Sequence, residues 1–119
     1  MPTREKTLAL CFVEPGRVEM REMSLPAMGP EDVLVEVRVC GVCQFDLHVF
    51  SGDPHFTYPM FGGHEAVGVV VETGRGVTGL RPGQPVAVGG GFSPHFAHYM
   101  VCHQSSARPL LVPVERFEH

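Results

Sequence analysis

Residues 33–40, with the sequence VLVEVRVC, constrain the fold of this chain more than any other stretch. Their valines stand at every second position, so in an extended conformation they share one face, while Glu36 and Arg38 share the other. A period of two fits a β-strand that buries one face, because a helix needs an apolar stripe with a period near 3.6. The stretch therefore predicts a strand in a sheet that is covered on one side.

Turn-forming residues favour a mainly β fold along the rest of the chain. Of 119 residues, 14 are glycine and 11 are proline, and they are spread along the sequence. Further strands are predicted over residues 7–13 and 17–23, joined by a tight turn at Pro15 and Gly16, and over residues 66–72, 85–88, 96–101 and 110–114. A short helical turn is predicted at 44–50 and an irregular loop at 51–63. No helix longer than about two turns is expected. We predict one mainly β domain over residues 1–119, a small barrel or sandwich with short helical turns.

Charge and composition argue against several classes of partner. The net charge is −4 and no cluster of lysine and arginine occurs, so neither a nucleic acid nor an anionic membrane is expected as a partner. No apolar run approaches the roughly 20 residues that span a bilayer. The first residues carry charges but no apolar stretch with a cleavage site, so a cytoplasmic protein with four reduced cysteines is expected.

Three metal-competent side chains lie at the ends of predicted strands. Cys43 follows the strand just described, and His64 and Glu65 precede a later one. Thiolate, imidazole and carboxylate groups bind zinc in proteins, and a catalytic zinc takes three ligands and keeps one position open. Asp46 would accept the second N–H of His64 and fix its tautomer. These residue types alone leave a plain alternative open, namely a small buried cysteine and a solvated His-Glu pair.

A Gly-His-Glu triplet followed by spaced glycines resembles the zinc signature of the zinc-dependent medium-chain alcohol dehydrogenases. The residues that carry this resemblance are Gly63, His64, Glu65, Gly68, Gly74 and Val77. The segment CGVCQFDLH, residues 40–48, resembles the first zinc segment of the same family, and the similarity extends over essentially the whole chain. The resemblance implies a GroES-like small β-barrel, which agrees with the period of two.

The resemblance also implies roles for single residues. Cys43 and His64 would bind a catalytic Zn²⁺, and Glu65 would lie beside the zinc and approach it when a water ligand leaves. Asp46 would hold His64, and His48 stands where some members place an outer proton-relay histidine. The implied reaction is NAD- or NADP-dependent hydride transfer, with zinc polarising the oxygen of a small alcohol, aldehyde or ketone.

Phe45 departs from the pattern of the family. It stands two positions after Cys43, where the family usually has a serine or threonine whose hydroxyl passes on the substrate proton. A phenyl ring relays no proton, so Phe45 is interpreted, with Phe50 and Phe56, as a candidate for lining an apolar substrate pocket. Cys40 makes a C-x-x-C pair with Cys43, but it alternates as a strand residue and is interpreted as core.

A second departure concerns the nicotinamide cofactor. In the family, the remaining zinc ligand and the Rossmann domain that binds NAD or NADP come after the position of His119. No G-x-G-x-x-G segment follows a strand within these residues, so the Rossmann domain is expected to be absent from them. The 119 residues alone are expected to be inactive without a complementary nucleotide-binding domain. The alternative is a free-standing GroES-like zinc-binding or interaction module without turnover.

Overall fold

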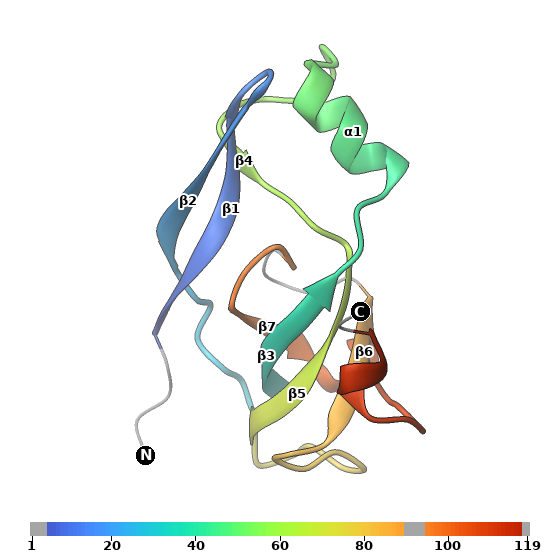
Figure 1. Cartoon of the computed structure of the whole chain (residues 1–119). Coiled ribbons are helices and arrows are strands. Elements are labelled where there is room, and N and C mark those ends of the chain that lie inside the picture. Colours follow the sequence, from blue (N-terminus) through green and yellow to red (C-terminus); the bar gives the residue numbers. More distant parts are fainter. Residues whose placement is uncertain (1–4, 90–94, 118–119) are drawn as a thin grey trace.

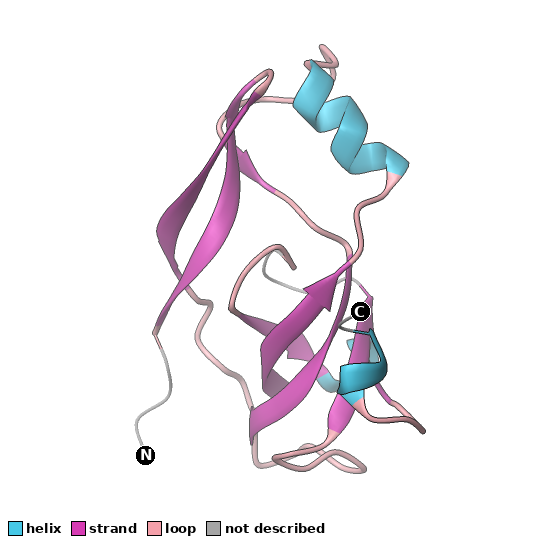
Figure 2. Cartoon of the chain, viewed as in Figure 1, coloured by secondary structure: helices cyan, strands magenta, loops and turns pink. Residues whose placement is uncertain are grey.

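The computed structural model describes residues 5–89 and 95–117. The expectation that the chain carries no leader rests partly on residues 1–4, which lie outside the described residues. Strands dominate the described part, and only short helical segments accompany them (Figure 2). The mainly β fold predicted from the period of two is confirmed.

A three-stranded antiparallel sheet is built mostly from the N-terminal part, in the order β2-β1-β4. Its strands are β1 (Lys6–Glu14), β2 (Arg17–Ser24) and β4 (Met60–Phe61). β1 and β2 form the predicted hairpin at Pro15 and Gly16, and Gly16 has a φ of 78°, a conformation that favours glycine. β4 lies in a segment predicted to be irregular, because a strand of two residues carries no periodic signal.

A five-stranded sheet forms the other part, in the order β7-β3-β5-β6-β8 (Figure 1). Its strands are β3 (Asp32–Cys40), β5 (Glu65–Thr73), β6 (Pro85–Gly89), β7 (Tyr99–His103) and β8 (Ala107–Pro109). β3 lies between β7 and β5, and β5 lies between β3 and β6. The C-terminal end of β3, which leads into the helix α1, therefore lies beside the N-terminal end of β5, at one end of the sheet.

The core covers β3 on both faces over part of its length. Val33 and Val35 are fully buried in a cluster with side chains of β5, β6 and β7. Leu34 is also buried, in a second cluster with Leu25 and Val101. The sequence pattern predicted only the first of these faces, because the residues that cover Leu34 come from a loop and from β7, which is far from it in the sequence.

The predictions for the C-terminal part need two corrections. Residues 110–114 form no strand, and the last strand, β8, comes earlier and pairs with β6. Pro109 and Pro113 have no backbone N–H to donate to a neighbouring strand. The apolar Leu111 is fully exposed, at 101%, rather than packed against a sheet. The strand predicted over 96–101 begins only at Tyr99, and an isolated bridge joins Ala97 to Ala9 in β1.

Helices are short, as predicted. α1 (Gln44–Ser51) has eight residues and ends at Gly52, whose φ is 94°. Two 3₁₀ turns, η1 (Gln104–Ser106) and η2 (Val114–Phe117), flank β8. Among the described residues, no helix has the length and apolar character needed to cross a membrane.

Burial of Cys102 predicts a loss of stability at alkaline pH. This side chain in β7 is 0% exposed, and burial, with a smaller effect of the Asp32 charge, raises the pKa of its thiol from 9.0 to about 11. Because folding holds the thiol neutral, the stabilisation is complete below pH 9 and is lost as the pH rises towards 11. The expected loss is about 2–3 kcal/mol.

Urea unfolding at pH 8, 9, 10 and 11 measures this loss. Cys102→Ala should flatten the decline in the free energy of unfolding. Part of the decline should remain in this variant, because burial also raises the pKa of Cys40 to about 11. The interpretation is wrong if Cys102→Ala loses as much stability with pH as the unsubstituted chain.

Candidate metal centre

The first turn of α1 holds Cys43 and Asp46 side by side. Cys43 is the N-cap residue, with an extended backbone at φ −114° and ψ 177°. Its backbone N–H donates to Oδ2 of Asp46 over 2.8 Å, and the backbone N–H of Asp46 donates to the carbonyl of Cys43 over 3.1 Å. A carboxylate at the third helical position stabilises a helix N-terminus. The cap therefore fixes both residues on one rigid turn.

A loop returns from α1 and places His64 directly before β5. The hydroxyl of Tyr58 donates to the carbonyl of Val49 and ties this loop to the helix. Gly63 has a φ of 99°, and a Cβ built there would lie 2.5 Å from the backbone nitrogen of Phe96. Only glycine fits such a position without displacing the neighbouring backbone. The imidazole of His64 is thereby brought to the start of α1.

The structure brings Cys43, Asp46 and His64 into one group. A ligand atom from each, Sγ, a carboxylate oxygen and a ring nitrogen, lies within 4.8 Å of the other two. Tetrahedral zinc with bonds of about 2.0–2.3 Å holds its ligand atoms roughly 3.3–3.8 Å apart. The ligand atoms therefore need to approach one another by no more than about 1.5 Å to surround a zinc ion, a shift within the reach of side-chain rotation.

Asp46 carries a second sign that the site suits a cation. Its side chain is 3% exposed, and its Oδ1 has no hydrogen-bond partner within the described part of the chain. A buried carboxylate oxygen without a partner is costly, and a bound cation or a donated N–H relieves that cost. A soft thiolate, an imidazole and this carboxylate together make a donor set that fits Zn²⁺.

Asp46 was predicted as a hydrogen-bond partner of His64, and that role stays a prediction. Oδ2 caps the helix, and no hydrogen bond joins the carboxylate to the imidazole among the described residues. Asp46 instead stands at a distance from which it can share a metal with Cys43 and His64. The C-x-x-D spacing of an N-cap and third helical position was the signal in the sequence for this arrangement.

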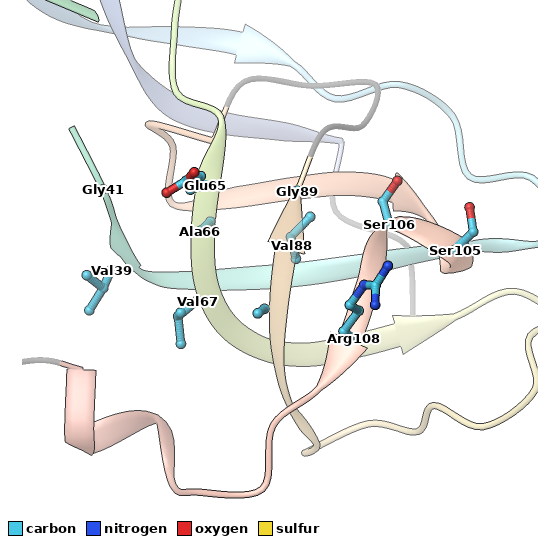
Figure 3. Close-up of a pocket in the computed structure, with 11 residues that line it drawn as sticks. Val39, Gly41, Glu65, Ala66, Val67, Val88, Gly89, Ser105, Ser106 and Arg108 are labelled. Carbon is cyan, nitrogen blue, oxygen red and sulfur yellow. The ribbon is translucent and has the colours of Figure 1, made fainter. Parts of the chain in front are cut away.

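Glu65 lies outside this group of three. It is the first residue of β5, and successive side chains of a strand point to opposite faces, which separates its exposed carboxylate from the imidazole of His64. Glu65 borders a hollow of about 650 Å³ whose lining includes Val39 and Val67. Figure 3 shows Glu65 at one end of the hollow, near Gly41, and Arg108 with two serines at the other. A role for Glu65 at the metal stays a prediction.

His48 and Cys40 also lie outside the group. His48 is exposed in the last turn of α1. Cys40 is half-buried rather than fully in the core, and burial raises the pKa of its thiol to about 11. No described residue forms a disulfide, and all four cysteines are free.

Phe45 covers the imidazole of His64. The ring centroids of the two residues are 4.5 Å apart with an interplanar angle of 82°, and Phe45 makes a second T-shaped contact with Phe56 at 4.9 Å and 78°. Phe45 and Phe50 are 37% and 43% exposed. Of the three aromatic rings that were predicted to line an apolar pocket, Phe45 thus contacts the metal-competent group directly, and Phe56 packs against Phe45.

Comparisons with known proteins identify the family of this chain. The family model described as alcohol dehydrogenase GroES-like domain matches residues 29–111. An alcohol dehydrogenase from Cupriavidus necator is 38% identical over 91 residues, which are 76% of this chain and 25% of that protein. An uncharacterized zinc-type alcohol dehydrogenase-like protein from Haemophilus influenzae is 38% identical over 87 residues, 71% of this chain and 25% of that protein.

Solved structures share the fold. A cinnamyl alcohol dehydrogenase from Sorghum bicolor superimposes with a TM-score of 0.81 at 22% identity, over 92% of this chain and 42% of that chain. At this identity the similarity concerns the fold alone. The chain spans about a quarter of the length of the curated relatives that it matches.

Proposed function

Because the chain belongs to the alcohol dehydrogenase GroES-like domain family, we propose that it is the zinc-binding catalytic-domain portion of an NAD(P)-dependent dehydrogenase. The proposal rests on one observation above all. Three side chains that can bind zinc, from the start of α1 and from the residue before β5, bring their ligand atoms within 4.8 Å of one another. The proposed substrates are small alcohols, aldehydes or ketones, in line with the name of the relative from Cupriavidus necator.

Each residue of the site has a proposed task. Cys43 and His64 hold the metal, and Oδ1 of the buried Asp46 completes the set or accepts the second N–H of His64 while Oδ2 keeps the helix cap. A bound zinc would supply a Lewis acid for an alcohol or carbonyl oxygen. Glu65, next in the chain to His64, would assist exchange of water at the site. His48, exposed in the last turn of α1, would accept the proton released by the alcohol substrate at the protein surface.

The remaining parts of the proposal concern the surroundings of the site. NAD or NADP would bind to a Rossmann domain that residues 1–119 do not supply. We take these residues as one domain, because β1 precedes the matched segment yet pairs with β4 and bridges to Ala97 inside it. A cytoplasmic location is proposed from the four free cysteines.

A chimeric enzyme tests the catalytic part of the proposal. Residues 1–119 replace the corresponding segment of the alcohol dehydrogenase from Cupriavidus necator, and NAD(P)-dependent turnover of small alcohols and aldehydes is measured. We expect turnover that disappears when the chimera carries Cys43→Ser. The parent enzyme and the binding of NAD(P) by the chimera serve as controls for folding.

The chimera also separates the two hypotheses. A folded chimera that binds zinc and NAD(P) but turns over none of these substrates would favour the free-standing zinc-binding or interaction module. A chimera whose turnover is unaffected by Cys43→Ser would contradict the proposed role of Cys43.

A further inference from the structure

The ring of His64 packs against an aromatic ring and has no hydrogen-bond partner among the residues that the structure describes. Phe45 lies with its centroid 4.5 Å from that of the imidazole, at 82° between the planes. Within residues 5–89 and 95–117, no hydrogen bond reaches the imidazole, although the His64 side chain is exposed. A solvent-exposed histidine without such a bond would turn freely about its side-chain torsions. The ring of Phe45 packs against the imidazole and restricts this rotation.

Phe45 is itself held on both sides. Phe56, from the loop after α1, packs against it in a second T-shaped pair with centroids 4.9 Å apart. The backbone of Phe45 lies in the first turn of α1, between Cys43 and Asp46. The 2.8 Å hydrogen bond of the helix cap fixes these two residues. T-shaped aromatic pairs at these separations are attractive beyond the burial of their area. The position of Phe45 is thus set by the same turn that carries the other two metal-competent residues.

We infer that Phe45 is a positioning residue that orients the imidazole of His64 towards the ligand atoms of Cys43 and Asp46. Metal-binding histidines commonly take their orientation from a hydrogen bond on the second ring nitrogen. In the metal-free form of this chain, an aromatic contact from Phe45 supplies that orientation, at the position where the family usually has a serine or threonine. The inference rests on the proposed zinc site. It goes beyond that proposal because it assigns an orienting role to Phe45, whose phenyl ring cannot relay a proton.

The first test uses the metal-free chain, so it does not depend on zinc. Phe45→Leu keeps an apolar side chain at a position that is 37% exposed, and the fold is followed by circular dichroism. NMR relaxation of the ring carbons of His64 measures how strongly the ring is ordered. We expect the order parameter of this ring to fall in Phe45→Leu and to be kept in Phe45→Tyr, which retains the ring. Unchanged order in Phe45→Leu would overturn the inference.

The second test measures the metal. The chain is stripped with a chelator and titrated with Co²⁺, whose absorption reports the geometry of its ligands. Phe45→Leu should bind Co²⁺ roughly 3- to 10-fold more weakly and with altered d–d bands, as expected for loss of one aromatic contact. Phe45→Tyr should restore both the affinity and the spectrum.

Phe50→Ala is the matched control, because Phe50 is an aromatic residue of the same helix with a similar exposure of 43%. It should leave the affinity and the spectrum unchanged. An equal effect of Phe50→Ala would overturn the inference, since any aromatic residue of α1 would then serve. A chain that binds no Co²⁺ at all, yet shows the loss of His64 order in Phe45→Leu, would refute the proposed zinc site while keeping the orienting contact.

Discussion

Replacing Cys43 with serine is expected to remove stoichiometric zinc from the purified chain. The thiolate is the softest of the three donors gathered within 4.8 Å, and a neutral serine hydroxyl is a poor zinc ligand at neutral pH. Loss of a residue that merely orients a ligand costs roughly 10- to 100-fold in metal affinity, so loss of the ligand itself should cost at least about 100-fold. Metal analysis should find about one zinc in the unsubstituted chain and nearly none in Cys43→Ser.

Cys40→Ser is the matched control for this experiment. Cys40 is a cysteine three positions earlier, at the end of β3, and it lies outside the group of metal-competent residues. The zinc content of Cys40→Ser should match that of the unsubstituted chain. His64→Ala should lose zinc as Cys43→Ser does. If Cys43→Ser keeps its zinc while Cys40→Ser loses it, the C-x-x-C pair binds metal in another way and the proposed site is wrong.

The sheets could be predicted from the sequence because their signal is local. The alternation in residues 33–40 places Val33 and Val35 in the core, and Pro15 with Gly16 forms the expected turn. The strand predicted over residues 110–114 was wrong for a related reason. They are apolar enough for a strand, but Pro113 has no backbone N–H to donate. The local pattern also does not show that β8, which ends at Pro109, already pairs with β6.

The site could be predicted only in part. Cys43 and His64 stand at the ends of β3 and β5, and the antiparallel pairing of these strands brings those ends together. Oδ2 of Asp46 caps the helix, which leaves Oδ1 for the site, and this division depends on the exact start of α1. Helix boundaries are the least certain part of a sequence-based prediction. The contact of Phe45 with His64 depends on the path of a loop, for which the sequence carries no periodic signal.

The glycines of the signature segment have structural reasons that the sequence only suggested. Gly63 needs its φ of 99°, as described above. Gly68 lies in β5 opposite Val37 of β3, and a Cβ there would be 2.2 Å from the carbonyl oxygen of Glu36 and 2.9 Å from Cγ1 of Val35. The two central strands approach each other at this point closely enough to exclude any side chain. The spacing of these glycines therefore follows from the packing around the site, whereas His64 contributes one of its metal-competent side chains.

Gly68→Ala is expected to destabilise the chain severely. The nearest atom to the added methyl group belongs to the backbone of β3, so no side-chain rotation can relieve the clash, and β3 or β5 must shift. Overpacking at a buried position costs up to about 3 kcal/mol, and the absence of a flexible neighbour favours the upper end of this range. For a chain of this length, such a loss lowers the melting temperature by roughly 10–20 °C.

Gly89→Ala provides the control, because Gly89 lies in the neighbouring strand β6 and a Cβ there meets no atom of the described residues within 4 Å. Its melting temperature should stay within about 2–3 °C of the unsubstituted value, as for other exposed substitutions. Thermal unfolding followed by circular dichroism measures both variants. Because β5 begins shortly before Gly68, at Glu65, and His64 immediately precedes it, a shift of β5 should also weaken zinc binding in Gly68→Ala and not in Gly89→Ala. A Gly68→Ala chain that melts like Gly89→Ala would show that β3 and β5 separate at little cost, and the rigid edge on which the proposed site depends would then be absent.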